Sequence, residues 1–311
     1  MTGMLPCFAA YPDKPIKLIV PFPPGGSTDI FARMLANQLT LQYKQPVIIE
    51  NKPGASGQIA MDILLSSPAD GYTIYLGNIG SLAVNVSLFK NLNYDPRRDL
   101  APISLIATVP NVLVVHSKLG VKTVAELITY AKQNPHQLTY SSGGNGSAAH
   151  TAMEYFKLQT GIHAVHIPYK GTSPAVTDVI GGQVDMIMTG VPPLMPFIQS
   201  GKVTALGVST LRRIEALPQV PAISETPLPA LKSFDVTQWY GLVVKGGTSK
   251  EIIHMLNVGV QHTFNNEAAI EQMKNAGAIV RVSTPAEFAA FIRIEVDRWA
   301  KVVKAADIQP G

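Results

Sequence analysis

The feature that most constrains this fold is a regular alternation between short β-branched runs and amphipathic helical stretches. Residues 17–21 predict a strand, residues 27–43 a helix with one apolar face, and residues 47–50 and 73–76 two further strands. Strands and helices that alternate in this way form βαβ units, in which helices cover a sheet of mainly parallel strands. The sequence therefore predicts an α/β protein with a largely parallel sheet.

The length of the chain predicts two domains. It has 311 residues, and a domain usually takes about 100–200. The helix after Thr284 carries an apolar stripe, and packing it on the first domain makes that domain discontinuous, with residues 11–105 and 235–311 around a second domain of residues 106–234. This division leaves two hinge crossovers. Trp239 is expected at the second, either as a reporter of hinge motion or as a tryptophan of the strand core unrelated to the cleft.

Three hydroxyl residues are each followed by a glutamate three positions later, the pattern of a capping box at a helix start. The pairs are Thr123 with Glu126, Thr248 with Glu251, and Thr284 with Glu287. Each pair predicts that a helix begins just after its threonine.

Composition and charge exclude several classes of function. The formal net charge is only +4 and the basic residues are scattered, so nucleic acid is not an expected partner. The apolar runs are far shorter than the roughly 18 residues that span a bilayer. A single cysteine, Cys7, excludes an internal disulfide and a metal site built from cysteines. His163 and His166 are three residues apart on a predicted strand, so their side chains point to opposite faces and no metal site is expected there. Residues 1–10 are interpreted as the end of a secretory signal or as a tag.

A glycine-rich loop joins the first predicted strand to the first helix. Two prolines precede Gly25 and Gly26, and Ser27 or Thr28 opens the helix. Free backbone N–H groups at such a helix start favour an anion. The alternative is an ordinary well-capped turn between a strand and a helix.

A second glycine-rich loop, residues 141–147, lies between another predicted strand and helix. Gly144, Gly146 and Ala149 fit the spacing G-x-G-x-x-A of a dinucleotide site, but the acidic residue expected after the next strand is absent. No phosphate-binding Gly-Lys-Ser/Thr motif follows either loop. What remains is a helix start that accepts a small anion.

The two loops belong to different predicted domains and both follow the carboxyl end of a strand, where open α/β sheets bind ligands. We therefore expect them to face each other as a clamp. Asn78, Ser81 and Thr189 also follow strands on this side, either as ligand donors or as partners of the local backbone.

Catalytic interpretations have less support. His150, early in the helix after the second loop, is either a general base or a packed histidine of the helix start. Asp185 is either an acceptor at the cleft or hinge, or a structural carboxylate at a strand end. No nucleophile elbow or zinc-protease motif is present.

Several segments of this sequence resemble one family, the Bug or TctC-type periplasmic receptors of tripartite tricarboxylate transporters. The resemblance runs from Tyr11 to the C-terminus and rests on residues 11–29, 47–57, 69–73, 167–171, 182–185 and 206–209. The sequence departs from the family's usual Thr-Pro at Thr248-Ser249, and a full signal peptide is not seen.

The resemblance implies a two-domain periplasmic-binding-protein (Venus-flytrap) fold that grips a ligand carboxylate between its two glycine loops. By position it assigns ligand binding to Gly25, Gly26, Ser27, Thr28 and Asp29 in the first loop, and to Ser142, Gly143, Gly146, Ser147 and His150 in the second. Phe22, Asn78, Ser81, Tyr169, Asp185 and Thr189 complete the expected set.

The resulting hypothesis is a periplasmic, monomeric receptor that binds a small carboxylate without a cofactor and delivers it to the membrane components of a tripartite tricarboxylate-type transporter. The alternatives are a sensor or regulatory module that uses the same clamp, and an α/β enzyme that acts on a carboxylic acid through His150 or Asp185. The sequence does not name the carboxylate, because recognition by backbone amides leaves little trace in the side chains.

Overall fold

The computed structural model describes residues 11–275 and 277–309, and the interpretation of residues 1–10 lies outside this range. The chain begins with β1 (Ile16–Val20), α1 (Ser27–Tyr43), β2 (Val47–Asn51), α2 (Gln58–Ser66), β3 (Thr73–Asn78), a π-turn (Gly80–Val84) and α3 (Asn85–Leu88). The long strand β4 (Leu100–His116) then leads to α4 (Val124–Gln133), β5 (Thr139–Ser142), α5 (Ala148–Thr160), β6 (Val165–Pro168), α6 (Thr172–Ile180), β7 (Met186–Gly190), α7 (Met195–Gln199) and β8 (Val203–Val208). The chain ends with β9 (Thr237–Lys245), α8 (Lys250–Thr263), α9 (Glu267–Asn275), β10 (Ile279–Val280) and α10 (Pro285–Ala305).

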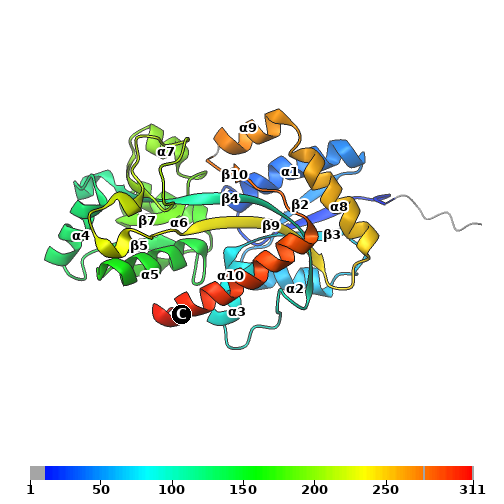
Figure 1. Ribbon diagram of the computed structural model, residues 1–311, viewed down its shortest axis with the longest axis horizontal. Helices are drawn as coiled ribbons and strands as arrows, with labels where there is room; N and C mark the ends of the chain where they lie inside the picture. Colours follow the sequence, from blue (N-terminus) through cyan, green and yellow to red (C-terminus); the bar gives the residue numbers. More distant parts are fainter. Residues whose placement is uncertain (1–10, 276, 310–311) are drawn as a thin grey trace, which may run out of the picture.

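These elements form two halves that lie side by side (Figure 1). The strands follow the order β2-β1-β3-β9-β4-β7-β5-β6, and β8 and β10 pair with β4. β4 belongs to both halves, because residues 100–110 pair with β9 and residues 111–116 pair with β7 and β8. The second connection runs from β8 back to β9. The chain therefore crosses between the halves in β4 and before β9, while the domain limits given above stay a prediction.

The expectation of a largely parallel sheet is only partly met. The strands β1, β2 and β3 are parallel, as are β5, β6 and β7. The strands β4 and β9, however, pair antiparallel with each other and with their neighbours. The sheet is therefore mixed, because β4 and β9 run antiparallel to each other and to the strands beside them.

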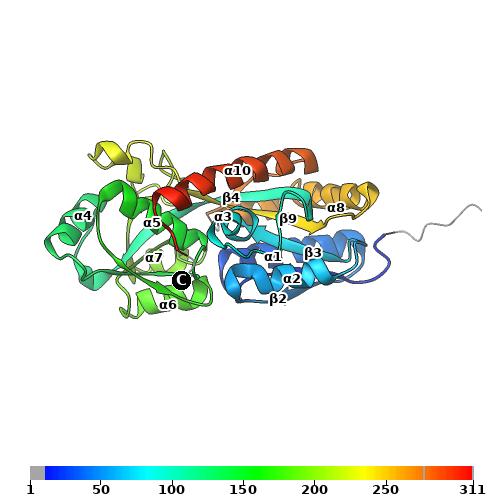
Figure 2. The same cartoon turned by 90° about the horizontal axis from the view of Figure 1, so that it is seen from below.

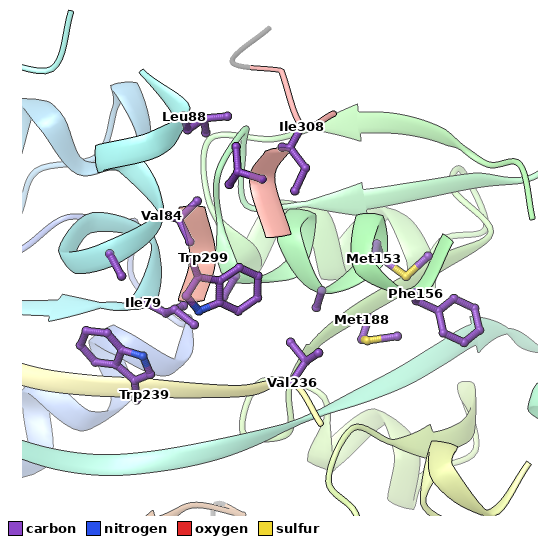
Figure 3. Packing of buried hydrophobic residues seen from close by; sticks show 14 of the residues in the cluster. Ile79, Val84, Leu88, Met153, Phe156, Met188, Val236, Trp239, Trp299 and Ile308 are labelled. Atoms are coloured by element: carbon purple, nitrogen blue, oxygen red, sulfur yellow. The ribbon is translucent and has the colours of Figure 1, made fainter. Parts of the chain in front are cut away.

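The hydrophobic core continues from one half to the other. One cluster includes Trp239, Trp299 and Val84 of the first half together with Met153 and Phe156 of the second (Figure 3). Helix α10 packs on β4, the π-turn and α3, and Ile308 just beyond it joins the same cluster. Figure 2 shows α10 lying along one side of the molecule above β4 and β9. The last helix thus packs on the first half, as its apolar stripe predicts.

Two of the three capping predictions place the helix start correctly. The hydroxyls of Thr123 and Thr284 accept hydrogen bonds from the amides three residues later. The start of α8 is displaced by one residue, since Ser249 accepts from the amide of Ile252 while Thr248 donates to the carbonyl of Lys245. Trp239 lies near the start of β9, close to the second crossover. Its side chain is buried against Phe288 and Phe291, and its indole N–H donates to the carboxylate of Glu295 at 2.7 Å. Its use as a reporter of hinge motion stays a prediction.

Within residues 11–275 and 277–309, no helix is long and apolar enough to cross a membrane. The same residues contain no group of three or more histidine, cysteine, aspartate or glutamate side chains that could hold a metal ion.

Candidate ligand-binding cleft

A cleft of about 330 Å³ lies between the two halves, at the carboxyl ends of their parallel strands. Its first wall is formed by Pro21, Phe22 and Phe89 and by the loop of residues 54–58. Its second wall is formed by residues 143–145 and 168–170. Of the predicted ligand residues, Phe22, Gly143 and Tyr169 line this cleft. Gly25, Gly26 and Gly146 lie outside this lining, where the two halves contact each other.

The first glycine loop is fixed from behind by Asp29. The buried carboxylate of Asp29 accepts hydrogen bonds from the amide of Gly25 at 3.0 Å, from Asn51 at 3.0 Å and from Arg33. Burial alone raises the pKa of Asp29, but the bonds from Arg33, Gly25 and Asn51 outweigh it and hold the pKa below its usual value. Asp29 is therefore an anionic support of the loop, and its oxygens are already occupied.

The start of α1 leaves backbone donors open. Gly26 has no side chain with which to cap the helix, and the amides of Ser27, Thr28 and Asp29 have no hydrogen-bond partner in the described part of the chain. Because these N–H groups point out of the helix start, they attract negative charge. This end of α1 lies against the second half, where a Cβ placed on Gly26 would be 3.6 Å from that of Thr172.

The second glycine loop is held by two histidines. The imidazole of His150 accepts a hydrogen bond from the amide of Gly146 through Nδ1 at 3.0 Å, and Ser147 caps α5. His166 contacts the hydroxyl of Ser142 through Nε2 at 2.6 Å, and that hydroxyl also accepts from the amide of Gly144. These bonds fix the shape of the loop, and the amides of Ala148 and Ala149 at the start of α5 have no partner within the described residues.

The environment of the two histidines keeps both uncharged near neutral pH. Their rings stack with centroids 4.1 Å apart. Burial, with a further contribution from Lys157, lowers the pKa of His150 to about 4, and burial and the neighbouring His150 lower the pKa of His166 to about 3. A neutral His150 whose Nδ1 already holds the loop is a positioning residue and a poor general base.

A turn of the first half lies directly against the second loop. The side-chain oxygen of Asn78 accepts from the amides of Gly80 and Ser81, so these predicted donors serve their own turn. A Cβ on Gly80 would lie 3.1 Å from the carbonyl oxygen of Gly146, which shows how closely the halves approach here. Thr189 is buried at the end of β7, and its hydroxyl has no partner among the residues that the structure describes.

The loop of residues 54–57 also lines the cleft, although the sequence did not lead us to predict these residues as part of the site. Ala55 and Ser56 have positive φ angles, 44° and 53°, which non-glycine residues rarely adopt outside functional or tightly constrained positions. The Ser56 hydroxyl donates across the cleft to the carbonyl of Asn145, and Asn85 donates to the carbonyl of Ser56 at 3.0 Å. The signal was present, because Pro53-Gly54 and Gly57 mark a loop at the carboxyl end of β2.

The structure does not bring every predicted residue to the cleft. The carboxylate of Asp185 accepts from the amide and hydroxyl of Thr139, both at 2.7 Å, at the amino ends of β5 and β7. This edge is opposite to the glycine loops, so Asp185 is a structural strand-end carboxylate. Tyr169 lines the cleft, but its hydroxyl donates to Asp178.

Comparison with known proteins identifies the family. The sequence matches the tripartite tricarboxylate transporter family receptor (TctC) over residues 31–308. The chain belongs to this family. It is 38% identical to protein BugT of Bordetella pertussis over 295 residues, which cover 94% of this chain and 90% of that protein. The resemblance to Bug and TctC-type receptors is thereby confirmed, and with it a family of periplasmic solute-binding receptors rather than of enzymes.

Two solved structures of this type are similar along almost the whole chain. The R. palustris protein Rpa4515, solved with adipate, has a TM-score of 0.93 at 34% identity and covers 97% of this chain and 100% of its own. MatC from Rhodopseudomonas palustris, solved with bound malate, has a TM-score of 0.88 at 28% identity over 94% and 100%. The expected periplasmic-binding-protein fold is confirmed.

Proposed function

We propose that this receptor binds a small carboxylate between its two halves in the periplasm and delivers it to the membrane components of a tripartite tricarboxylate-type transporter. The observation that carries this proposal is the pair of helix starts that face the opposite half, where the two halves contact each other. The open amides at Ser27–Asp29 in α1 and at Ala148–Ala149 in α5 each favour an anion. The two related structures hold the dicarboxylates adipate and malate, which supports the ligand class.

The geometry favours binding over chemistry. His150 supports the second loop through Nδ1. Asp29 supports the first loop through Oδ2, and its Oδ1 accepts from Arg33 and Asn51. Asp185, the other candidate acid or base, lies at the opposite edge of the sheet. The side chains nominated for catalysis are therefore occupied in holding the backbone that would grip the ligand.

A thermal-shift screen of mono-, di- and tricarboxylates tests the proposal, followed by calorimetry on each acid that stabilises the protein. We expect at least one acid to bind with a dissociation constant of about 1 μM or tighter, equivalent to roughly 8 kcal/mol. Several hydrogen bonds to a charged acceptor, at about 1.5–3 kcal/mol each, suffice for this affinity. Replacing the carboxylate by an amide should abolish binding, and equal affinity for the amide would contradict the proposal.

The enzyme and sensor alternatives have separate tests. Incubation of the bound acid with the protein, followed by NMR of the recovered compound, should return it unchanged. Uptake of the acid by membrane vesicles that contain the transporter should require the receptor. A receptor that binds the acid but never supports uptake would favour the sensor.

A further inference from the structure

Lys170 stands out among the residues that line the cleft. Of the described residues in this lining, it alone carries a charge, and its side chain is exposed at the rim. The rest of the lining is apolar or uncharged, including Phe22, Ser56 and Gln58. A single cation at the edge of an otherwise neutral cleft dominates the electrostatic potential that an entering ligand meets.

Lys170 also has no internal counter-ion. No carboxylate of residues 11–275 and 277–309 forms an ion pair with its ammonium group. The acidic side chain closest to it in sequence, Asp178, accepts from the hydroxyl of the neighbouring Tyr169. The charge of Lys170 is therefore available to a ligand.

The turn that carries Lys170 is held in place by the closed cleft. Gly171 has φ +136°, and a Cβ there would lie 2.4 Å from the ring of Pro23 in the first half. On the other side of Lys170, the carbonyl oxygen of Tyr169 would lie 3.1 Å from a Cβ on Gly144. The turn that carries Lys170 thus packs against both glycine loops.

Two separate groups can therefore attract a negatively charged ligand: the open amides at the two helix starts, and the ammonium group of Lys170 at the rim of the cleft. We infer that Lys170 is a specificity-determining residue that selects ligands with a second anionic group, so that a small dicarboxylate binds better than the matching monocarboxylate. This inference rests on the proposed function, because it assumes that the amides hold the first carboxylate. The ammonium group is exposed, so its contribution is modest and falls with salt.

The test compares straight-chain diacids of four to six carbons with the monoamide of each, by calorimetry at low and high salt. The monoamide keeps the size of the diacid and removes one charge. The variants are Lys170→Met and, as a matched control, Lys118→Met. Lys118 follows β4 at the opposite edge of the sheet and forms no ion pair within the part of the chain that the structure describes.

We expect Lys170→Met to weaken diacid binding about two- to fivefold at low salt and to leave monoamide binding unchanged. High salt should reduce the wild-type preference, and Lys118→Met should behave as wild type. An unchanged diacid-to-monoamide ratio in Lys170→Met overturns the role of Lys170 while leaving the proposed function intact. If no diacid or monoamide in the series binds wild type, this inference falls, and the proposed function is decided by the wider screen of carboxylates.

Discussion

The hydroxyl of Ser173 donates a hydrogen bond to the carbonyl oxygen of Pro24, 2.7 Å away on the other side of the cleft. A second serine, Ser56, makes the equivalent bond in the opposite direction, from the first half to the carbonyl of Asn145. Both bonds join a side chain of one half to the backbone of a glycine loop in the other. They form only when the halves are closed.

Removing these two bonds should loosen the closed state. We expect Ser56→Ala and Ser173→Ala each to speed ligand dissociation about two- to tenfold, since a hydrogen bond contributes about 0.5–1.5 kcal/mol. Association should change little, because the open protein already lacks both bonds. Stopped-flow or surface plasmon resonance kinetics measure this. Ser66→Ala removes a similar serine-to-carbonyl bond within α2 and should have no effect. Equal dissociation rates in all variants would contradict the prediction.

A side chain at Gly146 should obstruct the contact between the two halves. Its φ is +74°, and a Cβ would lie 2.3 Å from the side chain of Leu88 in the opposite half. We expect Gly146→Val to fold but to bind ligand at least about a hundredfold more weakly, equivalent to about 2.7 kcal/mol. Calorimetry measures the affinity, and circular dichroism checks the fold.

The matched control for this variant is Gly161→Val. Gly161 also has a positive φ of +69°, but nothing lies within 4 Å of its Cβ position. The control should lose stability and keep wild-type affinity. Loss of binding in both variants would show that backbone strain, rather than obstruction of the cleft, is responsible.

Gly26 differs from Gly146 and Gly161, since any residue can adopt its φ of −81°. Glycine is therefore required at Gly25 and Gly146, where φ is positive.

The two buried histidines predict a loss of stability in acid. Each titrates near 6.5 when unfolded, but the pKa values of His150 and His166 in the folded protein are about 4 and 3. The unfolded chain therefore takes up protons that the folded protein does not, and stability is lost as the pH falls from about 6.5 towards 4 and below. Urea denaturation between pH 7.5 and 4.5 should show a falling midpoint.

An asparagine places its side-chain oxygen near the position of His150 Nδ1, so it keeps an acceptor for the amide of Gly146 and does not titrate. His150→Asn should therefore reduce the pH dependence of the urea midpoint and leave the part due to His166. The same slope in His150→Asn as in wild type would show that the acid sensitivity arises elsewhere.

A buried polar chain links β4 and β9 where the two strands diverge. Gln238 accepts from the hydroxyl of Tyr240 and donates to the side chain of Asn111, both at 2.5 Å, and Asn111 donates to the carbonyl of Val236. Gln238→Met leaves buried polar atoms without partners, so we expect unfolding to become easier by about 1–3 kcal/mol. Gln133→Met, at an exposed position of α4, should cost less than about 0.5 kcal/mol. Urea denaturation compares the two.

Local patterns predicted the helix starts better than the long strands. The helix 27–43 has the predicted limits because Gly26 and Ser27 open it and an apolar face continues to Tyr43. The length of β4 could not be predicted in this way. Pro102 and Pro110 suggest breaks, but β4 accommodates them with register shifts between Pro102 and Ser104 and between Leu105 and Ala107 as it crosses between the halves.

The sequence predicted the two glycine loops of the candidate site. It did not predict the hydrogen bonds that Ser56 and Ser173 form between the two halves. A glycine-rich loop after a strand is a local signal, so Gly25 and Gly146 could be found from the sequence. The contacts of Ser56 and Ser173 depend on how the halves close, which no local pattern contains. Asp185 shows the same limit, because its sequence position beside β7 does not reveal which edge of the sheet its carboxylate serves.

The closed cleft implies a motion that ligand should drive. The bonds of Ser56 and Ser173 and the contact between Gly80 and Gly146 join the two halves, so we expect the halves to separate before a ligand reaches the amides. Ligand shifts such an equilibrium only by its differential affinity for the two states. We therefore expect small-angle scattering to show a smaller radius of gyration when wild type is saturated with ligand, and no change for Gly146→Val under the same conditions. The saturated curve should match the one calculated from this structure. If the ligand-free wild type already matched that curve, closure would not depend on ligand and the prediction would fail.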